Sequence, residues 1–235
     1  MNKKFILPLS LIILVGLAIF VSASYSSDKN QGSLIISKGW NLVPVASYEL
    51  QKSDSEVKFS DFKYGYLYMG SKGYTLVFKD GNWIQNPNGL HGSWASNEEE
   101  AQKLIQSSMW VYSDVEGQLV FNWGQAGFNS ELFQLSKYKL SKGYNFLFVT
   151  PEMAIGVIGN PSTARSLNDI KGDCTFEKVY SYKQDEGGWI NLMSSLDDKR
   201  MLGENSAQMY GLVVKISDAC SLGYNGEALP PSIPN

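Results

Sequence analysis

The feature that most constrains this chain is a set of four short motifs that recur in the same order. The motif pairs are residues 37–42 and 141–146, 59–62 and 167–170, 81–84 and 188–191, and 111–114 and 215–218. The first pair reads SKGWNL and SKGYNF, and the first and last pairs share an offset of 104 residues. Motifs that keep their order and spacing predict a tandem repeat of one structural unit.

The motifs place two related modules at residues 33–122 and 138–224, with a linker at 123–137 between them. A second interpretation stays open, because residues 71–74 (SKGY) show the first motif a third time. A glycine after Ser-Lys forms a tight turn at little cost, and the aromatic residue then begins an extended segment. On that interpretation the motif marks only the entrance to a strand.

Each module is predicted to be mostly β, so the fold class is mainly β: all-β, or a β-rich α+β fold with one or two short helices. Aromatic and β-branched residues form short runs that turn residues separate, as in strands. The predicted elements are a strand at 64–69, hairpins at 74–85, 110–121 and 179–192, and a late strand at 211–216. Asp80 and Gly81 supply the positive φ that the tight turn of the first hairpin needs.

Two segments are candidates for the helices. Residues 96–105 contain Ser96 and Glu99 at the spacing of a capping box, and Lys103 follows Glu99 by four positions. Residues 162–170 form a second, shorter candidate. The tail at 225–235 contains three prolines and is predicted to be disordered.

The N-terminus has the pattern of an export signal. Two lysines precede an apolar run at 5–21, and Val21 and Ala23 occupy the positions that a signal peptidase reads. We therefore expect residues 1–23 to be a signal peptide. The alternative is an uncleaved anchor, because residues 5–23 approach the roughly 20 apolar residues that span a bilayer. In both cases the protein is expected to be secreted or at the cell surface.

The two cysteines, Cys174 and Cys220, both lie in the second module. In an exported protein an even pair of cysteines within one small module predicts a structural disulfide. Two cysteines and one histidine leave little material for a metal site, so we expect neither a metal nor a cofactor. The first module has no cysteine, and its stability is expected to come from packing.

Catalytic patterns are weak, and we expect a protein that is not an enzyme. The one histidine, His91, lies two residues before Ser93 in a glycine-rich loop, and sequence neighbours rarely form a triad. Ser55 and Lys58 have Ser-x-x-Lys spacing but lack the companion motifs of serine acyl-enzymes. Four aspartates at matching places in the modules are predicted to be turn or cap residues rather than an acid pair: Asp61, Asp114, Asp169 and Asp218.

Aromatic residues are the remaining functional signal, with 6 Trp, 13 Tyr and 11 Phe. Three tryptophans in predicted loops are candidates for ligand contact: Trp83, Trp94 and Trp123. They could stack on sugar rings or anchor a protein partner. The alternative for each is burial in a core, which is the commoner use of aromatic side chains.

The module openings resemble a known class of repeat. Residues 38–42 and 142–146 are similar to the Lys-Gly-Trp-Asn-Leu start of "GWN"-type β-rich modules, which occur in exported and surface proteins of archaea and bacteria. A Tyr-rich strand and a Gly-Trp strand follow in such modules, as residues 64–69 and 188–189 do here. The second module departs from the pattern at Tyr144 and in its cysteine pair. The resemblance implies an accessory or surface role and brings no catalytic residues.

These observations favour an exported, non-enzymatic protein that acts by binding or by structure at the cell surface. The alternative is an envelope protein that binds or cleaves carbohydrate, and a third hypothesis is a subunit tethered to the membrane through residues 5–23. A net charge of −3 offers no basic surface for nucleic acid. The expected partner is a cell-surface protein or a glycan.

Overall fold

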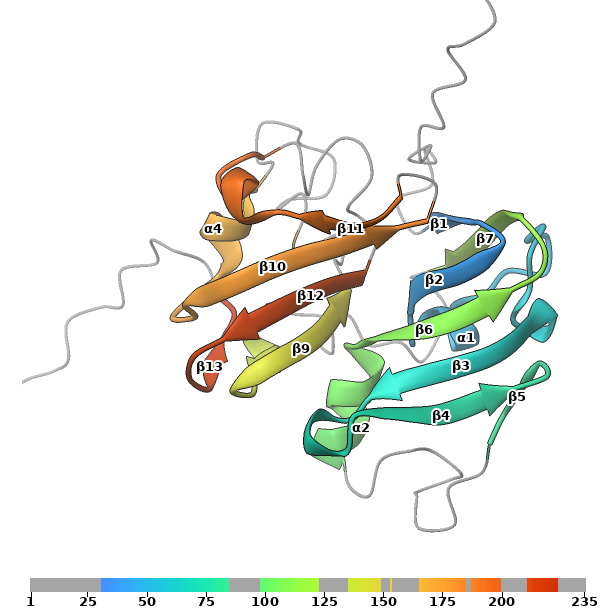
Figure 1. Cartoon of the computed structure of the whole chain (residues 1–235), viewed down its shortest axis with the longest axis horizontal. Helices are drawn as coiled ribbons and strands as arrows, with labels where there is room; N and C mark the ends of the chain where they lie inside the picture. Colours follow the sequence, from blue (N-terminus) through green and yellow to red (C-terminus); the bar gives the residue numbers. More distant parts are fainter. Residues whose placement is uncertain are drawn as a thin grey trace, which may run out of the picture.

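The computed structural model describes residues 31–84, 98–122, 135–148, 153, 165–184, 187–199 and 211–223. Within them thirteen strands form four antiparallel sheets joined by short helical segments (Figure 1), which confirms the predicted β-rich fold class. The predicted signal segment 1–23, the tail 225–235 and linker residues 123–134 lie outside the described residues. No helix in the described ranges has the length and apolar character needed to cross a membrane.

Two larger sheets dominate the molecule. The N-terminal sheet has the order β2-β6-β3-β4-β5, and the C-terminal sheet has the order β11-β10-β12-β9. The strands of the N-terminal sheet are β2 (Gly39–Pro44), β3 (Phe62–Tyr68), β4 (Tyr74–Lys79), β5 (Asn82–Trp83) and β6 (Ser108–Ser113). Those of the C-terminal sheet are β9 (Gly143–Phe148), β10 (Phe176–Lys183), β11 (Gly188–Asn191) and β12 (Gly211–Ile216).

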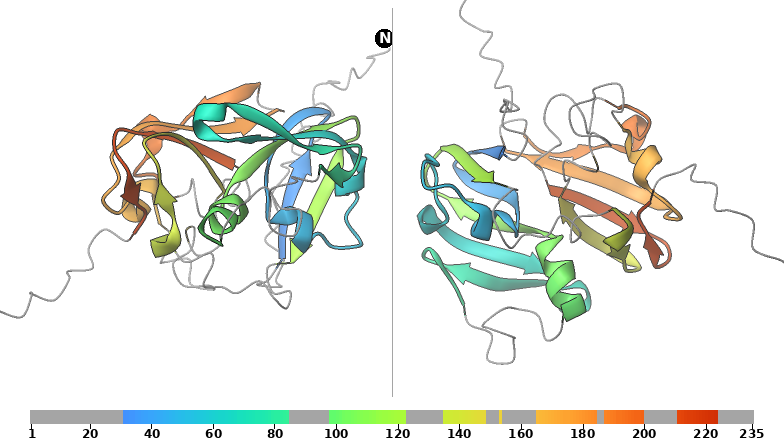
Figure 2. Two further views of the ribbon diagram at one scale, coloured as in Figure 1. Left: turned by 90° about the horizontal axis from the view of Figure 1, so that it is seen from below. Right: turned by 180° about the vertical axis from the view of Figure 1, so that it is seen from behind.

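Two smaller sheets and several short helical segments complete the described structure. The small sheets pair β1 (Gln31–Ile36) with β7 (Gly117–Asn122), and β8 (Lys139–Leu140) with β13 (Cys220–Ser221). The helical segments are α1 (Ser47–Leu50), η2 (Phe59–Asp61), η3 (Gly70–Lys72), α2 (Glu98–Ile105), η6 (Leu135–Lys137), α4 (Leu167–Ile170) and η8 (Met193–Ser195). Viewed from behind, α1 and α2 lie on the side of the molecule opposite the face seen in Figure 1 (Figure 2).

The two larger sheets have the same strand order, and their corresponding strands run in opposite directions. The order β2-β6-β3-β4 corresponds strand by strand to the order β9-β12-β10-β11. Within each sheet all neighbouring strands are antiparallel. In Figure 1 the arrows of β3 and β10 point in opposite directions, as do those of β6 and β12. A half-turn about the viewing direction therefore brings one sheet approximately onto the other.

Strand register corrects two of the expected motif matches. Ser113 is paired with Gly39, and Ile216 is paired with Gly143, so β6 and β12 correspond at an offset of 103 rather than 104. The strand order also makes β11 the counterpart of β4, because both lie beside the equivalent strands β3 and β10. The expected match between residues 81–84 and 188–191 therefore does not join equivalent strands.

Most predicted strands form, but one predicted hairpin does not. The turn of the β4–β5 hairpin has Asp80 and Gly81 at φ 48° and 81°, as expected. The β10–β11 hairpin and the late strand β12 also form. Residues 110–121 do not make a hairpin, because β2 and β3 occupy both edges of β6 and β7 pairs with β1 instead. The Ser113 hydroxyl donates to the carbonyl of Val115 at 2.7 Å and bends the chain between the sheets.

The helices agree with the predictions in part. In α2 the Lys103 Nζ lies 3.0 Å from the Glu99 carboxylate, as predicted, and Ser96 is outside the described residues. Helix α4 is shorter than the predicted 162–170, because its cap fixes the start at Ser166. The Ser166 backbone N–H donates to the Asp169 carboxylate at 2.8 Å, and this bond holds the pKa of Asp169 below its usual range.

Each larger sheet covers its own hydrophobic core with its inner face. Phe78, Val111 and Phe121 belong to the N-terminal core, and Val179, Val214 and Ile216 belong to the C-terminal core. A third cluster of Leu42, Phe146 and Val213 lies where the two sheets meet. Because this cluster takes residues from β2, β9 and β12, it joins the outer faces of both sheets.

The predicted disulfide is present between Cys174 and Cys220. It connects the chain before β10 to the short strand β13, across 46 residues of sequence. Nearby, the Asp173 carboxylate accepts from the Ser221 N–H at 2.7 Å, and the Gly172 N–H donates to the Gly223 carbonyl at 3.0 Å. The crosslink therefore reinforces a corner that has few strand hydrogen bonds of its own.

Candidate functional site

The two Ser-Lys-Gly-aromatic-Asn segments build the same closed turn. Gly39 and Gly143 have φ of 100° and 98°, a conformation that glycine adopts without a Cβ penalty. The Asn41 side chain accepts from the Ser37 N–H at 3.0 Å and donates to the Ser37 carbonyl at 2.8 Å. Asn145 makes the equivalent bonds to Ser141 at 2.9 and 2.7 Å. The motif thus fixes a turn that leaves its aromatic residue pointing outward.

Loss of either asparagine should destabilise the protein. We expect Asn41→Ala and Asn145→Ala each to lower the free energy of unfolding by about 1–2 kcal/mol, because several side chain–backbone hydrogen bonds disappear together. Urea unfolding measures the change. Asn82→Ala is the matched control, because Asn82 is exposed and donates one bond, to the Asp80 carbonyl. Equal effects at Asn41, Asn145 and Asn82 would contradict the role of the motif.

Positive-φ glycines precede most of the exposed aromatic residues. Among described residues the exposed aromatic side chains are Trp40, Tyr64, Tyr74, Tyr144 and Trp189. All but Tyr64 directly follow a glycine with positive φ; these glycines are Gly39, Gly73, Gly143 and Gly188. The third Ser-Lys-Gly segment is a different turn, since η3 precedes Gly73 and no asparagine follows. It nevertheless places Tyr74 at the start of a strand with its side chain exposed.

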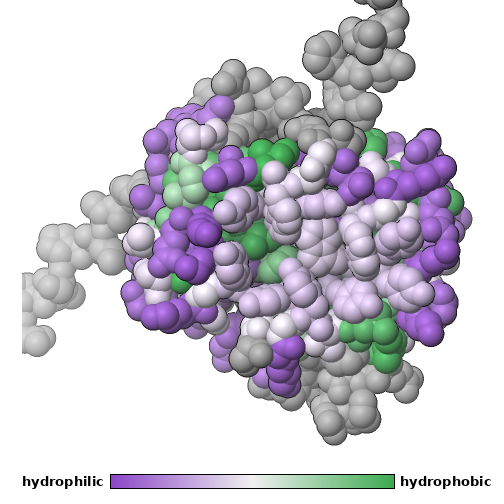
Figure 3. Space-filling view, viewed as in Figure 1, coloured by the Kyte–Doolittle hydropathy of each residue, from purple (hydrophilic) through white to green (hydrophobic). Residues whose placement is uncertain are grey.

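These aromatic residues gather on the outer faces of the two larger sheets. Strand residues alternate between core and outer face, and most outward positions near the junction are aromatic. They are Trp40, Tyr66, Tyr68, Tyr74, Trp110, Tyr144, Phe146, Tyr180, Tyr182 and Trp189, which we name the aromatic face. The middle of this face has the intermediate hydropathy of tyrosine and tryptophan (Figure 3). Tyr74 and Trp189 are its most exposed members, at 54% and 51%.

Contacts across the junction hold the two halves of the face together. The ring centroids of Trp110 and Tyr182 lie 4.6 Å apart, and those of Tyr68 and Phe146 lie 5.1 Å apart. Beneath the rings the Ser108 hydroxyl donates to the Leu147 carbonyl at 2.6 Å. Because Ser108 is buried in β6 and Leu147 lies in β9, this bond ties the N-terminal sheet to the C-terminal sheet.

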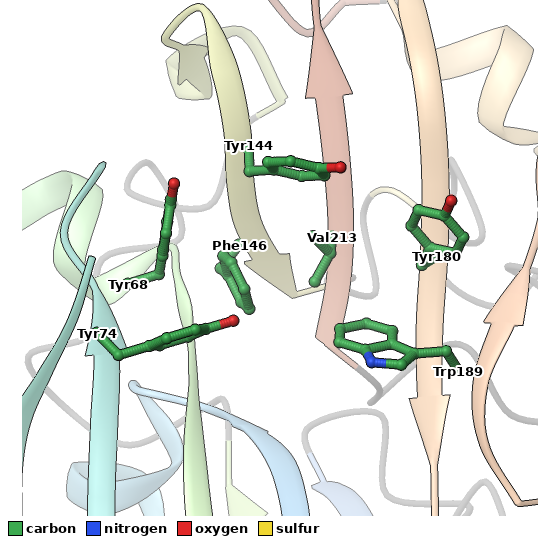
Figure 4. Close-up of a pocket in the computed structure, with 7 residues that line it drawn as sticks. All are labelled: Tyr68, Tyr74, Tyr144, Phe146, Tyr180, Trp189 and Val213. Atoms are coloured by element: carbon green, nitrogen blue, oxygen red, sulfur yellow. The ribbon is translucent and has the colours of Figure 1, made fainter. Parts of the chain in front are cut away.

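Two open hollows lie side by side on the aromatic face, and both sheets contribute to each. The first has a volume of about 470 Å³ and is lined by Trp40, Tyr66, Tyr74, Trp110, Tyr182 and Trp189. The second has a volume of about 370 Å³ and is lined by Tyr68, Tyr74, Tyr144, Phe146, Tyr180, Trp189 and Val213. Figure 4 shows Tyr74 pointing from the N-terminal sheet toward Phe146, with Tyr68 beside them and Trp189 on the far side. Both volumes fall within the usual range of ligand pockets, roughly 300–1,000 Å³.

Most contacting rings of the face stand at steep angles to one another, and the exception is Tyr68 with Phe146, at 34°. Trp110 meets Trp189 at 86° and Tyr182 at 84°, and Trp40 meets Tyr66 at 61°. Edge-to-face pairs of this kind are favourable and fix ring orientation. The face is therefore a set of walled hollows rather than a flat platform of coplanar rings.

Among the described residues no charged side chain lines either hollow, but ion pairs lie near the edges of the sheets. The Lys215 Nζ lies 2.6 Å from the Glu177 carboxylate, and this bond raises the pKa of Lys215. Lys63 is paired with Asp114, which raises the pKa of Lys63. With only rings, tyrosine hydroxyls and one valine in their linings, the hollows can offer stacking surfaces and hydrogen bonds.

Of the three tryptophans predicted from sequence to contact a ligand, the structure describes Trp83, and Trp83 does not line either hollow. Trp83 is half-buried and packs against the N-terminal core, with its ring centroid 5.4 Å from that of Tyr48. Trp94 and Trp123 lie outside the described residues. His91 and Ser93 are outside them as well. The Ser55 hydroxyl donates to the Val120 carbonyl at 2.8 Å, so it stabilises a turn beside β7.

The predicted cap role of two aspartates is confirmed. Asp61 accepts from the Lys58 N–H at 2.8 Å, as Asp169 does from Ser166. Asp114 is instead paired with Lys63, and Asp218 lies 4.0 Å from the Lys142 Nζ. Within the described ranges one cluster of metal-ligand type occurs, at Asp173, Cys174 and Cys220, and its two sulfurs are joined to each other.

Comparisons of the chain with protein-family models, with curated proteins and with solved structures give no match. Sequence reasoning missed Tyr74 and Trp189, although a signal for them existed. Each is an aromatic residue that directly follows a turn glycine at the first or second position of a strand.

Proposed function

We propose that the protein is exported and acts by binding a ligand on the aromatic face, without catalysis. The observation that carries this proposal is the gathering of exposed aromatic side chains from two separate sheets around two hollows. Exposed aromatic residues that line concave surfaces are common anchors of ligands and partners. The described residues that line the hollows include no carboxylate, histidine, serine or lysine, and this composition favours recognition over reaction chemistry.

Export is supported by the N-terminal sequence and by the disulfide. A basic start, an apolar run and small residues near position 23 fit a signal peptide, with an N-terminal anchor as the alternative. A crosslink between Cys174 and Cys220 is typical of oxidising compartments. We therefore place the aromatic face outside the cell, where it meets envelope material.

We also infer that the two larger sheets descend from one duplicated module. The equal strand order, the two Asn-closed turns and the two aspartate caps recur in the same relative places. The turn-only interpretation does not account for the shared strand order. Duplication would explain why one face carries two similar hollows.

The binding role is tested by removing the two most exposed rings of the face. The exported chain, with its disulfide intact, is incubated with cell envelope isolated from its own host. We expect Tyr74→Ala/Trp189→Ala to bind at least tenfold more weakly than the wild type, because hot-spot aromatic residues contribute about 2 kcal/mol or more each. The matched control is Ile35→Ala/Val115→Ala, which removes exposed apolar side chains that line neither hollow. Unchanged binding by the aromatic variant would refute the proposal.

A further inference from the structure

We propose that the ligand of the aromatic face is a single linear glycan chain and that the two hollows are equivalent subsites along it. This inference rests on the binding function proposed above and adds the class of ligand. It is carried by the correspondence between the two hollows, the chemistry of their linings and the angles between their rings.

Strand register shows that the hollows are counterparts. Tyr74 is paired with Tyr68 in the N-terminal sheet, and Trp189 is paired with Tyr182 in the C-terminal sheet. Through the same registers the equivalent pairs are Trp40 and Tyr144, Tyr66 and Tyr180, Tyr68 and Tyr182, Tyr74 and Trp189, and Trp110 and Val213. If each residue that lines the first hollow is replaced by its equivalent in the other sheet, the resulting set is the lining of the second hollow, which contains Phe146 in addition.

The internal geometry of the two hollows agrees with this correspondence. The ring centroids of Tyr68 and Tyr74 lie 5.4 Å apart, and those of Tyr182 and Trp189 also lie 5.4 Å apart. Tyr74 and Trp189 each line both hollows, so the hollows adjoin. Two adjoining, equivalent hollows suit a ligand that presents the same unit twice. A polymer of repeating units has that property.

The linings favour sugar as the repeating unit. Sugar rings have apolar C–H faces bordered by hydroxyl groups, which match aromatic faces bordered by tyrosine hydroxyls. Arginine and methionine, which are enriched at protein interfaces together with aromatic residues, line neither hollow within the described part of the chain. The described linings likewise include no lysine that would attract a phosphate polymer or an anionic membrane.

The angles between the rings favour a single glycan chain as the ligand over the flat surface of a polysaccharide. Since Trp110, Tyr182 and Trp189 meet at 79–86°, their rings form walls around a hollow. One or a few sugar units can lie between such walls. The planar surface of a crystalline polysaccharide would contact only their edges.

The two ends of the face differ and give the site a direction. Tyr112 is paired with Trp40 beside the first hollow, whereas Lys215 is paired with Tyr144 beside the second. Lys215, which is paired with Glu177, therefore corresponds to the aromatic residue Tyr112 at the other end of the face. Because glycan chains have distinct ends, we expect one orientation of the chain to be preferred.

The first experiment identifies the ligand class with host envelope as the probe. One sample is digested with protease, a second is extracted with chloroform and methanol, and a third receives both treatments. We expect full binding to all three, and loss of that binding in the Tyr74→Ala/Trp189→Ala variant. Binding lost after protease would overturn the glycan inference in favour of a protein partner, and binding lost after extraction would overturn it in favour of a lipid. Either of these two results would leave the proposed binding function intact. That function is refuted only if the Tyr74→Ala/Trp189→Ala variant still binds the envelope.

The second experiment tests the paired subsites. Material that has survived both treatments is partially hydrolysed by acid, separated by size, and titrated calorimetrically into the exported protein. We expect fragments of two or three sugars to bind with a stoichiometry of two, and fragments of eight or more to bind with a stoichiometry of one. The long fragments should bind at least tenfold more tightly, because one chain then occupies both hollows.

Variants that affect one hollow supply the matched comparison. Trp40 lines only the first hollow and Tyr144 only the second. We expect Trp40→Ala and Tyr144→Ala each to reduce the stoichiometry of short fragments from two to one. Each should also remove the advantage of long fragments. A stoichiometry of one for short fragments in the wild type, or an affinity independent of length, would overturn the paired-subsite inference.

Discussion

Reduction of the Cys174–Cys220 disulfide is expected to lower the free energy of unfolding of the C-terminal part by about 2–5 kcal/mol. The bond closes 46 residues of chain, so its loss greatly increases the freedom of the unfolded state. The corner that it ties has little else to hold it, because β8 and β13 share only two residue pairs. Cys174 is buried in the C-terminal core, so the two thiols formed by reduction would have to move apart within closely packed surroundings.

Urea unfolding with and without a reductant measures this effect, and hydrogen exchange locates it. We expect protection to fall in β8, β10, β12 and β13, while the core strands β3 and β6 keep theirs. The Cys174→Ser/Cys220→Ser variant is the control, since its stability should not respond to the reductant. If reduction of the wild type leaves its unfolding midpoint unchanged, the disulfide does not stabilise the fold.

Substitution of Gly211 by alanine is expected to destabilise the protein by about 1–3 kcal/mol through overpacking at the junction of the sheets. A Cβ added at Gly211 would lie 2.3 Å from the Leu42 Cγ and 2.8 Å from the Ser108 Oγ. Leu42 cannot move aside freely, because it is buried in the cluster with Phe146 and Val213. The sheets would have to separate, which would change both hollows.

Thermal unfolding of Gly211→Ala measures the loss of stability, and the envelope assay measures its effect on binding. Gly223→Ala is the matched control, because the nearest heavy atom to its added Cβ is 3.6 Å away. Combining Gly211→Ala with Leu42→Ala should destabilise the protein by less than the sum of the two single changes, because the two residues are in contact. If Gly211→Ala is as stable as the control, the junction is not closely packed.

The Ser-Lys-Gly-aromatic-Asn motif illustrates how far local chemistry reaches. The glycine turn is predicted from the sequence, and the structure adds the asparagine side chain that closes the turn. Together they fix the turn and the outward direction of Trp40 and Tyr144. The hairpin at Asp80-Gly81, the cap at Asp169 and the cysteine pair are likewise local or compositional features. They could be predicted because few distant residues influence them.

The candidate site was much less predictable, because it depends on which strands become neighbours. Tyr74 and Trp189 lie 115 residues apart in sequence and belong to different sheets. Trp83 has a similar sequence context, yet it packs toward the N-terminal core beside Tyr48 and Phe78. The sequence cannot separate these cases, since both faces of a strand rich in aromatic residues read as apolar.

By itself the sequence determined the β-rich class, the glycine turns of the two repeated motifs, the disulfide and the export pattern that is expected at the N-terminus. Only the tertiary structure decided that β6 pairs with β2 and β3 rather than with β7, and that the outer faces of two sheets meet at Leu42, Phe146 and Val213. The physical reason is that turns and caps are settled by residues a few positions apart. Strand partners and shared faces are settled by burial summed over the whole chain, which no short window of sequence contains.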